Sequence, residues 1–385
     1  MAAPSWPHDA DFFVNYALTE ERAILRDSVR SFLTAHHDAA RCRAFRTTKH
    51  GFDQPFWSQM AEMGWLSLRL PEDLQGLGLS VAEAVVVARE LGERAVADPF
   101  VVASLMPSVV LAAAGRSDLS VSLAAGLASG QLTLAMMVGD ARLHIEAGKL
   151  SGDIQVYSIA SGCRLCLQAT YEGRPAILVI EIDRAGVSQR VLARMDGSAG
   201  AAVSLRGVSF TAADLLVVGE GAAAAWRRAH SEGLIAVSAQ LTGLSSALLK
   251  NTVTYLRQRV QFGQPLINFQ VIQHKLVELA ILTRLAESSY RRALRAYLES
   301  PDGAHDALHA AKARCSDAAS EMARAAVQLH GAIGYTDDCE VAGYFRSALT
   351  LSQLMGNSAW HRAQLWSHQP ASATAPQTER GRVDG

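Results

Sequence analysis

The chain has 385 residues, 49% hydrophobic and 19% charged, so it is long enough for two or three structural regions around a large buried core. Its 36 Lys and Arg residues balance 37 Asp and Glu residues, for a formal net charge of -1. No overall field draws such a chain to nucleic acid or to an anionic membrane, and we expect neither as a partner.

The five cysteines are scattered and odd in number, which favours reduced thiols in a cytoplasmic protein over a disulfide framework. Cys163 and Cys166 form an isolated CxxC within a strand-like alternation. Because a zinc site needs about four ligands, we expect no metal site there or elsewhere. The acidic start lacks the basic end and apolar core of a secretory signal. Residues 100–139 are too often interrupted for a membrane span.

The first region, residues 1–128, is predicted to be helical. Thr19 is placed to cap a first helix with acidic residues in its first turn, and a second helix is expected over residues 55–63. Proline and glycine make residues 64–79 a loop. The helical pattern resumes at Ser80 and continues, with breaks, almost to the end of the region.

The second region, residues 129–220, is predicted to be a small all-β domain. Short β-prone runs alternate with turn residues, which include Glu172-Gly173 and Asp196-Gly197. The clearest runs are residues 164–169, 176–182 and 202–210.

The third region, residues 221–368, is predicted to be a helical bundle. Long helices are expected over residues 270–299 and 305–329, and residues 369–385 have a composition typical of a disordered tail. An apolar stripe at alternating spacings of three and four residues precedes these two helices: Leu234, Val237, Leu241, Leu244 and Leu248. The fold class is thus mainly α with a central β domain. Sequence pattern alone does not identify the function.

Two segments carry a resemblance to a known family. RVQFGQPL at residues 259–266, followed by Phe269-Gln270, resembles the RxQFGxPI..FQ signature of acyl-CoA dehydrogenases. QLHGAIGY at residues 328–335, with Arg346 downstream, is similar to the family's QxxGGxGY and R-D-A segment. The resemblance spans most of the chain in the correct order. It implies an N-terminal helical domain, a small β-barrel or sandwich and a C-terminal four-helix bundle.

The resemblance implies FAD as the cofactor. In the family, the adenine and pyrophosphate half of FAD is held partly by a neighbouring subunit, through these two segments. Here Ala332 stands where the family has its second glycine. Each residue also has a plainer interpretation than cofactor contact. Arg259 could lie on the surface, Phe262 could belong to the core, and Gln328 with Gly331 could form an ordinary helix end. The residues expected to contact the cofactor are Arg259, Gln261, Phe262, Gln328, Gly331 and Ala332.

The part of the site that would meet the flavin ring and the substrate departs from the family pattern. The family places a TEPxxGSD loop and a WxT strand in its β domain, whereas residues 134–142 read LAMMVGDAR. The strand aligned with WxT is Val156-Tyr157-Ser158, which lacks the tryptophan, although Ser158 offers a hydroxyl in place of threonine.

The family's catalytic glutamate is also missing. Along the pattern RDAxxxxIxEGT, its position falls on Met355, and a thioether cannot accept a proton at neutral pH. The family's other base position aligns with Gly233. The neighbouring Glu232 is a weak substitute, because one residue along a helix turns a side chain by about 100°. We therefore expect no catalytic base in this chain.

The retained segments are those that a subunit of the family contributes to its neighbour's FAD site. The missing loop, strand and base are those that it needs for its own active site. The chain resembles the base-lacking subunit of heteromeric acyl-CoA dehydrogenases, often heterotetramers with two copies of each subunit. This implies a base-bearing paralogue as partner, α,β-dehydrogenation of a bulky acyl-CoA, such as a steroid-derived thioester, and an electron-transfer flavoprotein as acceptor. The alternatives are a self-sufficient flavoenzyme of altered chemistry and a scaffold that has lost flavin. His274 and Arg346 are expected to have structural roles.

Overall fold

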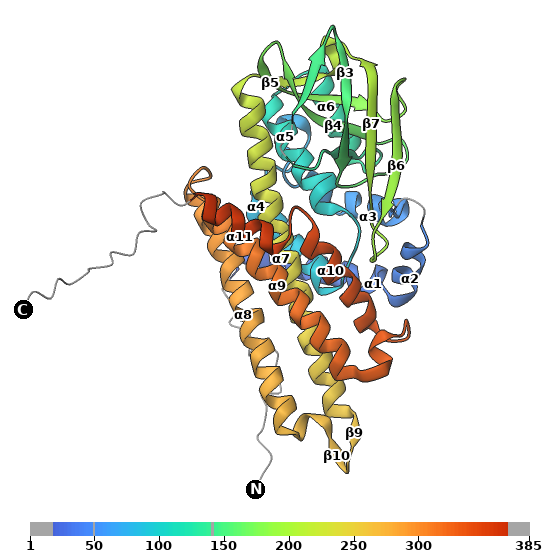
Figure 1. The fold of residues 1–385 in the computed structure, drawn as a ribbon, viewed down its shortest axis with the longest axis vertical. Helices are drawn as coiled ribbons and strands as arrows, with labels where there is room; N and C mark the ends of the chain where they lie inside the picture. Colours follow the sequence, from blue (N-terminus) through green and yellow to red (C-terminus); the bar gives the residue numbers. More distant parts are fainter. Residues whose placement is uncertain (1–17, 49–50, 140–141, 369–385) are drawn as a thin grey trace, which may run out of the picture.

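A computed structural model describes residues 18–48, 51–139 and 142–368 (Figure 1). Helices come first, a sheet follows, and helices close the chain, which confirms the predicted fold class. The targeting prediction for the first residues and the disorder predicted for residues 369–385 lie outside the described residues. Asp140 and Ala141 of the 134–142 segment do so as well.

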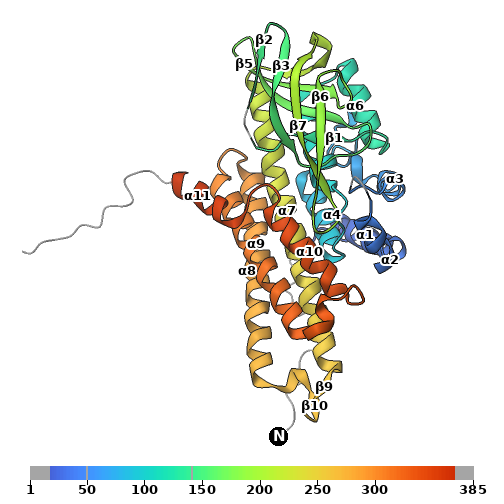
Figure 2. The same cartoon turned by 45° about the vertical axis from the view of Figure 1, so that its right-hand side comes forward.

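The N-terminal helices begin where short polar side chains cap them. Thr19 accepts a hydrogen bond from the Arg22 amide at 3.4 Å, as predicted, and Ser80 and Glu83 form a capping box. The second of these helices was not predicted, because its sequence AARCRAFR has no apolar repeat. The helices are α1 Glu20–His36, α2 Ala39–Arg46, α3 Gln54–Glu62, α4 Val81–Glu93, α5 Met106–Ala114 and α6 Asp118–Ala128. Figure 2 shows α1 to α4 beside the junction between sheet and bundle.

The central strands form one mixed sheet in the order β6-β7-β3-β2-β4-β5-β8, with β1 paired to β4. The three predicted runs correspond to β4, β5 and β7. The predicted turn at Glu172-Gly173 joins β4 to β5, and both residues have a left-handed backbone, with φ of 50° and 75°. The strands are β1 Leu134–Met136, β2 Leu143–Glu146, β3 Lys149–Val156, β4 Arg164–Tyr171, β5 Arg174–Glu181, β6 Val187–Ala193, β7 Ala199–Ser209 and β8 Leu215–Val218.

The C-terminal helices pack around α7, which runs from the sheet to the far end of the molecule (Figure 1). All five residues of the predicted apolar stripe on α7 are buried. By length and composition α7 could cross a membrane, but 94% of its most apolar window is buried inside the protein. The elements are α7 Glu220–Gln258, β9 Val260–Gln261, β10 Gln264–Pro265, α8 Gln270–Glu299, α9 His305–His330, α10 Glu340–Gln353 and α11 Ser358–His368.

Two glycines let α4 and α7 cross at close range. A Cβ atom added to Gly92 would lie 2.0 Å from the backbone oxygen of Gln240, and one added to Gly243 would lie 2.0 Å from that of Arg89. These neighbours are backbone atoms and cannot rotate away. The crossing therefore requires glycine on both helices, and it joins the N-terminal helices to the bundle.

Candidate functional site

The first predicted cofactor segment forms a hairpin at the end of the bundle. β9 and β10 pair antiparallel, and Phe262 and Gly263 form the turn with φ of 54° and 78°. The Phe262 side chain is 88% exposed and makes an edge-to-face contact with Phe269, with ring centroids 6.1 Å apart. The alternative of a core phenylalanine is thereby excluded, and the chain presents an aromatic ring to its surroundings.

The second predicted cofactor segment ends α9. Gln328 is exposed on the last turn, and Gly331 caps the helix with φ of 68°. A Cβ atom at Gly331 would meet nothing within 4 Å, so within this chain the glycine serves the backbone conformation and not a close approach. Ala332 is exposed as well.

The fold brings these two segments to the same end of the bundle. The Tyr255 ring, just before the hairpin, stacks on the His330 ring at 4.2 Å, and its hydroxyl donates to the His330 backbone oxygen at 3.3 Å. The hairpin lies far from the sheet in Figures 1 and 2. All six predicted cofactor residues, Arg259, Gln261, Phe262, Gln328, Gly331 and Ala332, are exposed. They form a surface that a second subunit can reach.

The two positions at which the family carries its base face each other. Met355 follows α10 with a left-handed φ of 61° and is buried. A Cβ atom added to Gly233 on α7 would lie 2.9 Å from both the Met355 methyl carbon Cε and the Met106 sulfur. Thioether side chains from α5 and from the turn after α10 thus pack against α7 at Gly233. Neither position supplies a group that takes a proton.

Glu232 is next to this contact in sequence but is held elsewhere. Arg69 donates to both of its carboxylate oxygens at 2.8 Å, and the Tyr297 hydroxyl donates to one of them at 3.2 Å. The carboxylate raises the pKa of Arg69 through these hydrogen bonds, and burial together with Glu232 raises the pKa of Tyr297. The two-point arginine pair fixes the orientation of this buried carboxylate.

The segment aligned with the family's flavin loop is pinned to its neighbours. Val138 donates its amide to the Gln155 oxygen at 2.7 Å, and the Trp226 indole donates to the Gly139 oxygen at 3.2 Å. Tyr157, in the WxT-aligned segment, donates its amide to the Met136 oxygen at 3.0 Å. Tyr157 and Ser158 are both buried, just beyond the end of β3. The described part of this segment is therefore hydrogen-bonded to β3 and α7.

The remaining sequence candidates have structural surroundings. Arg346 pairs with Asp337 at 2.8 Å, and Arg46 of α2 shares the same carboxylate at 2.9 Å. His274 is exposed on α8, so it does not pack within this chain. Cys166 is completely buried, and this burial raises the pKa of its thiol to about 12.

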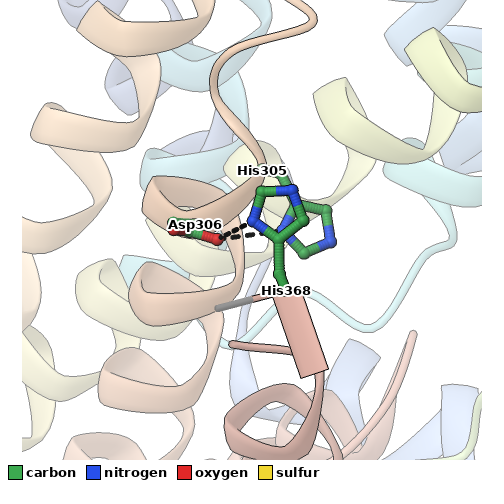
Figure 3. A group of neighbouring side chains, drawn as sticks. All are labelled: His305, Asp306 and His368. Carbon is green, nitrogen blue, oxygen red and sulfur yellow. Dashed lines mark hydrogen bonds and ion pairs between the residues drawn. The ribbon is translucent and has the colours of Figure 1, made fainter. Parts of the chain in front are cut away.

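Two features were not anticipated from the sequence. A cavity of about 130 Å³ lies between α2 and α10 and is lined by Arg41, Cys42 and Tyr344 among others. A group of possible metal ligands, His305, Asp306 and His368, lies where α9 begins and α11 ends (Figure 3). The spacing of His305 and His309, one helical turn apart, was a signal available in the sequence.

Comparison with known proteins agrees with the motifs. The family model of the acyl-CoA dehydrogenase N-terminal domain matches residues 19–133, and that of the C-terminal domain matches residues 219–368. The chain belongs to the acyl-CoA dehydrogenase family. Relatives include acyl-CoA dehydrogenase IpdE2 of Mycobacterium tuberculosis, 29% identical over 87% of this chain and 93% of that protein. The IpdE2 protein of Mycolicibacterium smegmatis is 26% identical over 88% of this chain and 96% of that protein.

Solved acyl-CoA dehydrogenase structures share the fold of this family member. A variant of the Tcur3481-Tcur3483 steroid ACAD superposes with a TM-score of 0.80 at 25% identity, over 91% of this chain and 98% of that chain. The ChsE4-ChsE5 complex from Mycobacterium tuberculosis superposes with a TM-score of 0.81 at 23% identity, over 92% of this chain and 99% of that chain.

Proposed function

We propose that this chain is the non-basic subunit of a heteromeric acyl-CoA dehydrogenase and that it contributes to an FAD site shared with a base-bearing paralogue. The observation that carries the proposal is the contact of Met355 and Met106 with Gly233. Met355 aligns with one base position of the family, and two thioethers lie against Gly233, which aligns with the other; this supports the absence of a base in this chain. The base for α-proton removal has to come from another chain.

The residues that would hold FAD from the neighbouring side are retained. Arg259 offers a planar set of donors suited to pyrophosphate, Phe262 an apolar face and Gln328 a polar edge. All three are exposed at one end of the bundle. The 88% exposed ring of Phe262 is an apolar surface that a partner can bury.

The reaction proposed for the complex is that of the family. Bound at the shared site, FAD would supply the acceptor for the β-hydride, and a partner carboxylate would take the α-proton, so that the acyl-CoA thioester would become the enoyl-CoA. The proposed acceptor of the two electrons is an electron-transfer flavoprotein. The name of the steroid ACAD neighbour supports a bulky, steroid-derived acyl group as the substrate class.

The test is the flavin content of the purified protein. We would express the full chain alone and together with a base-bearing acyl-CoA dehydrogenase paralogue encoded beside it. Bound FAD would be measured by absorbance after denaturing release, and acyl-CoA oxidation with a ferricenium acceptor. We expect stoichiometric FAD and activity only when the two chains co-purify.

Each alternative gives a different result. Stoichiometric FAD on the chain alone overturns the proposal in favour of a self-sufficient flavoenzyme of altered chemistry. Absence of FAD both alone and with the paralogue favours a scaffold that has lost the cofactor. A complex that binds FAD but stays active after the paralogue's glutamate is replaced by glutamine would show that the base lies elsewhere.

A further inference from the structure

The beginning of α9 and the end of α11 lie side by side and present histidines to each other (Figure 3). His305 and His309 are four residues apart on α9, and His361 and His368 are seven residues apart on α11. Both spacings place a pair on one helix face. The two faces meet, and the His305 ring lies 4.3 Å from the rings of both His309 and His368.

The outer part of this group converges on one carboxylate oxygen. Nδ1 of His305 lies 3.1 Å from Oδ1 of Asp306, and Nδ1 of His368 lies 2.9 Å from the same atom. One possible ligand atom from each residue lies within 4.8 Å of those of the other two. His305 is half-buried, while Asp306 and His368 are exposed, so an ion from solvent can reach the group.

The inner part of the group is committed to packing. His361 donates from Nε2 to the backbone oxygen of Met355 at 3.1 Å. In its neutral form His361 therefore accepts at Nδ1, and the His309 Nδ1–H donates to it at 2.8 Å. This buried pair fixes α11 to α9 near Met355 and supports the His305 ring from beneath. The supporting contact restricts the orientation of His305 before any ion binds.

We propose that His305, Asp306 and His368 bind one divalent transition-metal ion of the zinc class. Two imidazoles and a carboxylate are a usual protein ligand set for zinc, and the imidazoles disfavour Mg²⁺ and Ca²⁺. Bonds of about 2.0 Å to a tetrahedral ion place its ligand atoms about 3.3 Å apart. The 2.9 Å and 3.1 Å separations are close to that value. The fourth position faces solvent and takes water.

The ion joins the last turn of α11 to the first turn of α9. The other end of α11 is already held, because His361 bonds to the Met355 oxygen and Lys312 donates to the Gly356 oxygen at 3.0 Å. Metal binding therefore fixes the second end of a short helix that directly follows the Met355 turn. This inference is independent of the shared FAD site.

Metal titration of the full chain, expressed without a polyhistidine tag and stripped with EDTA, tests the site. We expect calorimetry with ZnCl₂ to give one ion per chain with a micromolar dissociation constant. Saturation should raise the melting temperature by about 3 °C. CoCl₂ should give the intense visible bands of a four-coordinate ion. H305Q, D306N and H368Q should each weaken binding at least about tenfold.

H274Q is the matched control, because His274 is an exposed histidine on α8, outside the cluster. It should bind zinc as the wild type does. No saturable binding by the wild type, or equal binding by H305Q and H368Q, overturns the proposal and leaves an exposed His–Asp–His ion pair of small energetic value. Metal binding is read without flavin, so its failure is distinct from failure of the shared FAD site.

Discussion

Lys312 on α9 is completely buried and holds the turn that carries Met355. Its ammonium donates to the Ser316 hydroxyl at 2.9 Å and to the backbone oxygens of Ser352 and Gly356 at 3.1 and 3.0 Å. Burial lowers the pKa of Lys312 from its ordinary value of 10.5 to about 7. The side chain satisfies carbonyl groups at the end of α10, but its charge is costly there.

This pKa predicts a pH dependence of stability. Between pH 7 and 10.5 the unfolded chain keeps a proton on Lys312 that the folded chain has lost. The free energy of unfolding should therefore rise with pH through this window, by up to about 1.4 kcal/mol per pH unit from this group. Below pH 7 both states are protonated and the contribution is flat. Urea denaturation between pH 6.5 and 9.5 measures the slope.

The variant K312M should lose this contribution to the slope, although it also leaves the carbonyl groups unpaired. K250M is the control, since Lys250 is exposed on α7 and its replacement should leave the slope as in the wild type. Identical slopes for K312M and the wild type would contradict the prediction.

At the scale of elements, the crossing of α4 and α7 depends on backbone contact. Gly243 approaches the Arg89 backbone so closely that G243A must push the helices apart. We expect a loss of about 3 kcal/mol in the free energy of unfolding. G343A is the control: Gly343 on α10 has nothing within 4 Å of an added Cβ atom. It should be neutral or stabilising by up to about 1 kcal/mol, because alanine favours a helix.

Chemical denaturation of both variants checks the pair. G243A as stable as G343A would mean that the two helices adjust without cost. Far-ultraviolet circular dichroism should show the same helix content in both, because the change affects how α4 and α7 pack and not whether they form.

At the scale of the whole molecule, the hairpin at residues 259–266 extends from the end of the bundle. We expect it to contribute little to the stability of its own chain. F262A should change the stability of the isolated chain by less than about 0.5 kcal/mol, since the side chain is 88% exposed. In the complex proposed above, the same variant should lower bound FAD severalfold. Denaturation of the chain and flavin content of the complex are the two measurements.

L298A is the control for F262A, because Leu298 is 51% exposed and lies at the opposite end of α8 from the hairpin. It should leave FAD unchanged. A similar loss of FAD in both variants would point to general disturbance of the surface. Full retention of FAD in F262A would remove the hairpin from the cofactor site.

Contacts between distant residues explain what the sequence did not reveal. The methyl carbon of Met355 reaches Gly233 only because the turn after α10 packs on α7. Glu232 is one residue from the position aligned with a family base, yet its carboxylate is held by Arg69, which is 163 residues away. The ligand group at the end of α11 likewise joins residues 62 positions apart. No short window of sequence contains these pairs.

The sequence by itself determined the order of helices and strands, the cap of α1, the buried stripe of α7 and the family. Each of these is encoded locally, in a period, a capping residue or a contiguous motif. Only the tertiary structure decided that the Met106 and Met355 thioethers lie against Gly233, that the two motif segments share one exposed end, and that the cluster of His305, Asp306 and His368 exists. The physical reason is that these depend on how α7, α9 and α11 pack, which is set by side-chain contacts across the whole core.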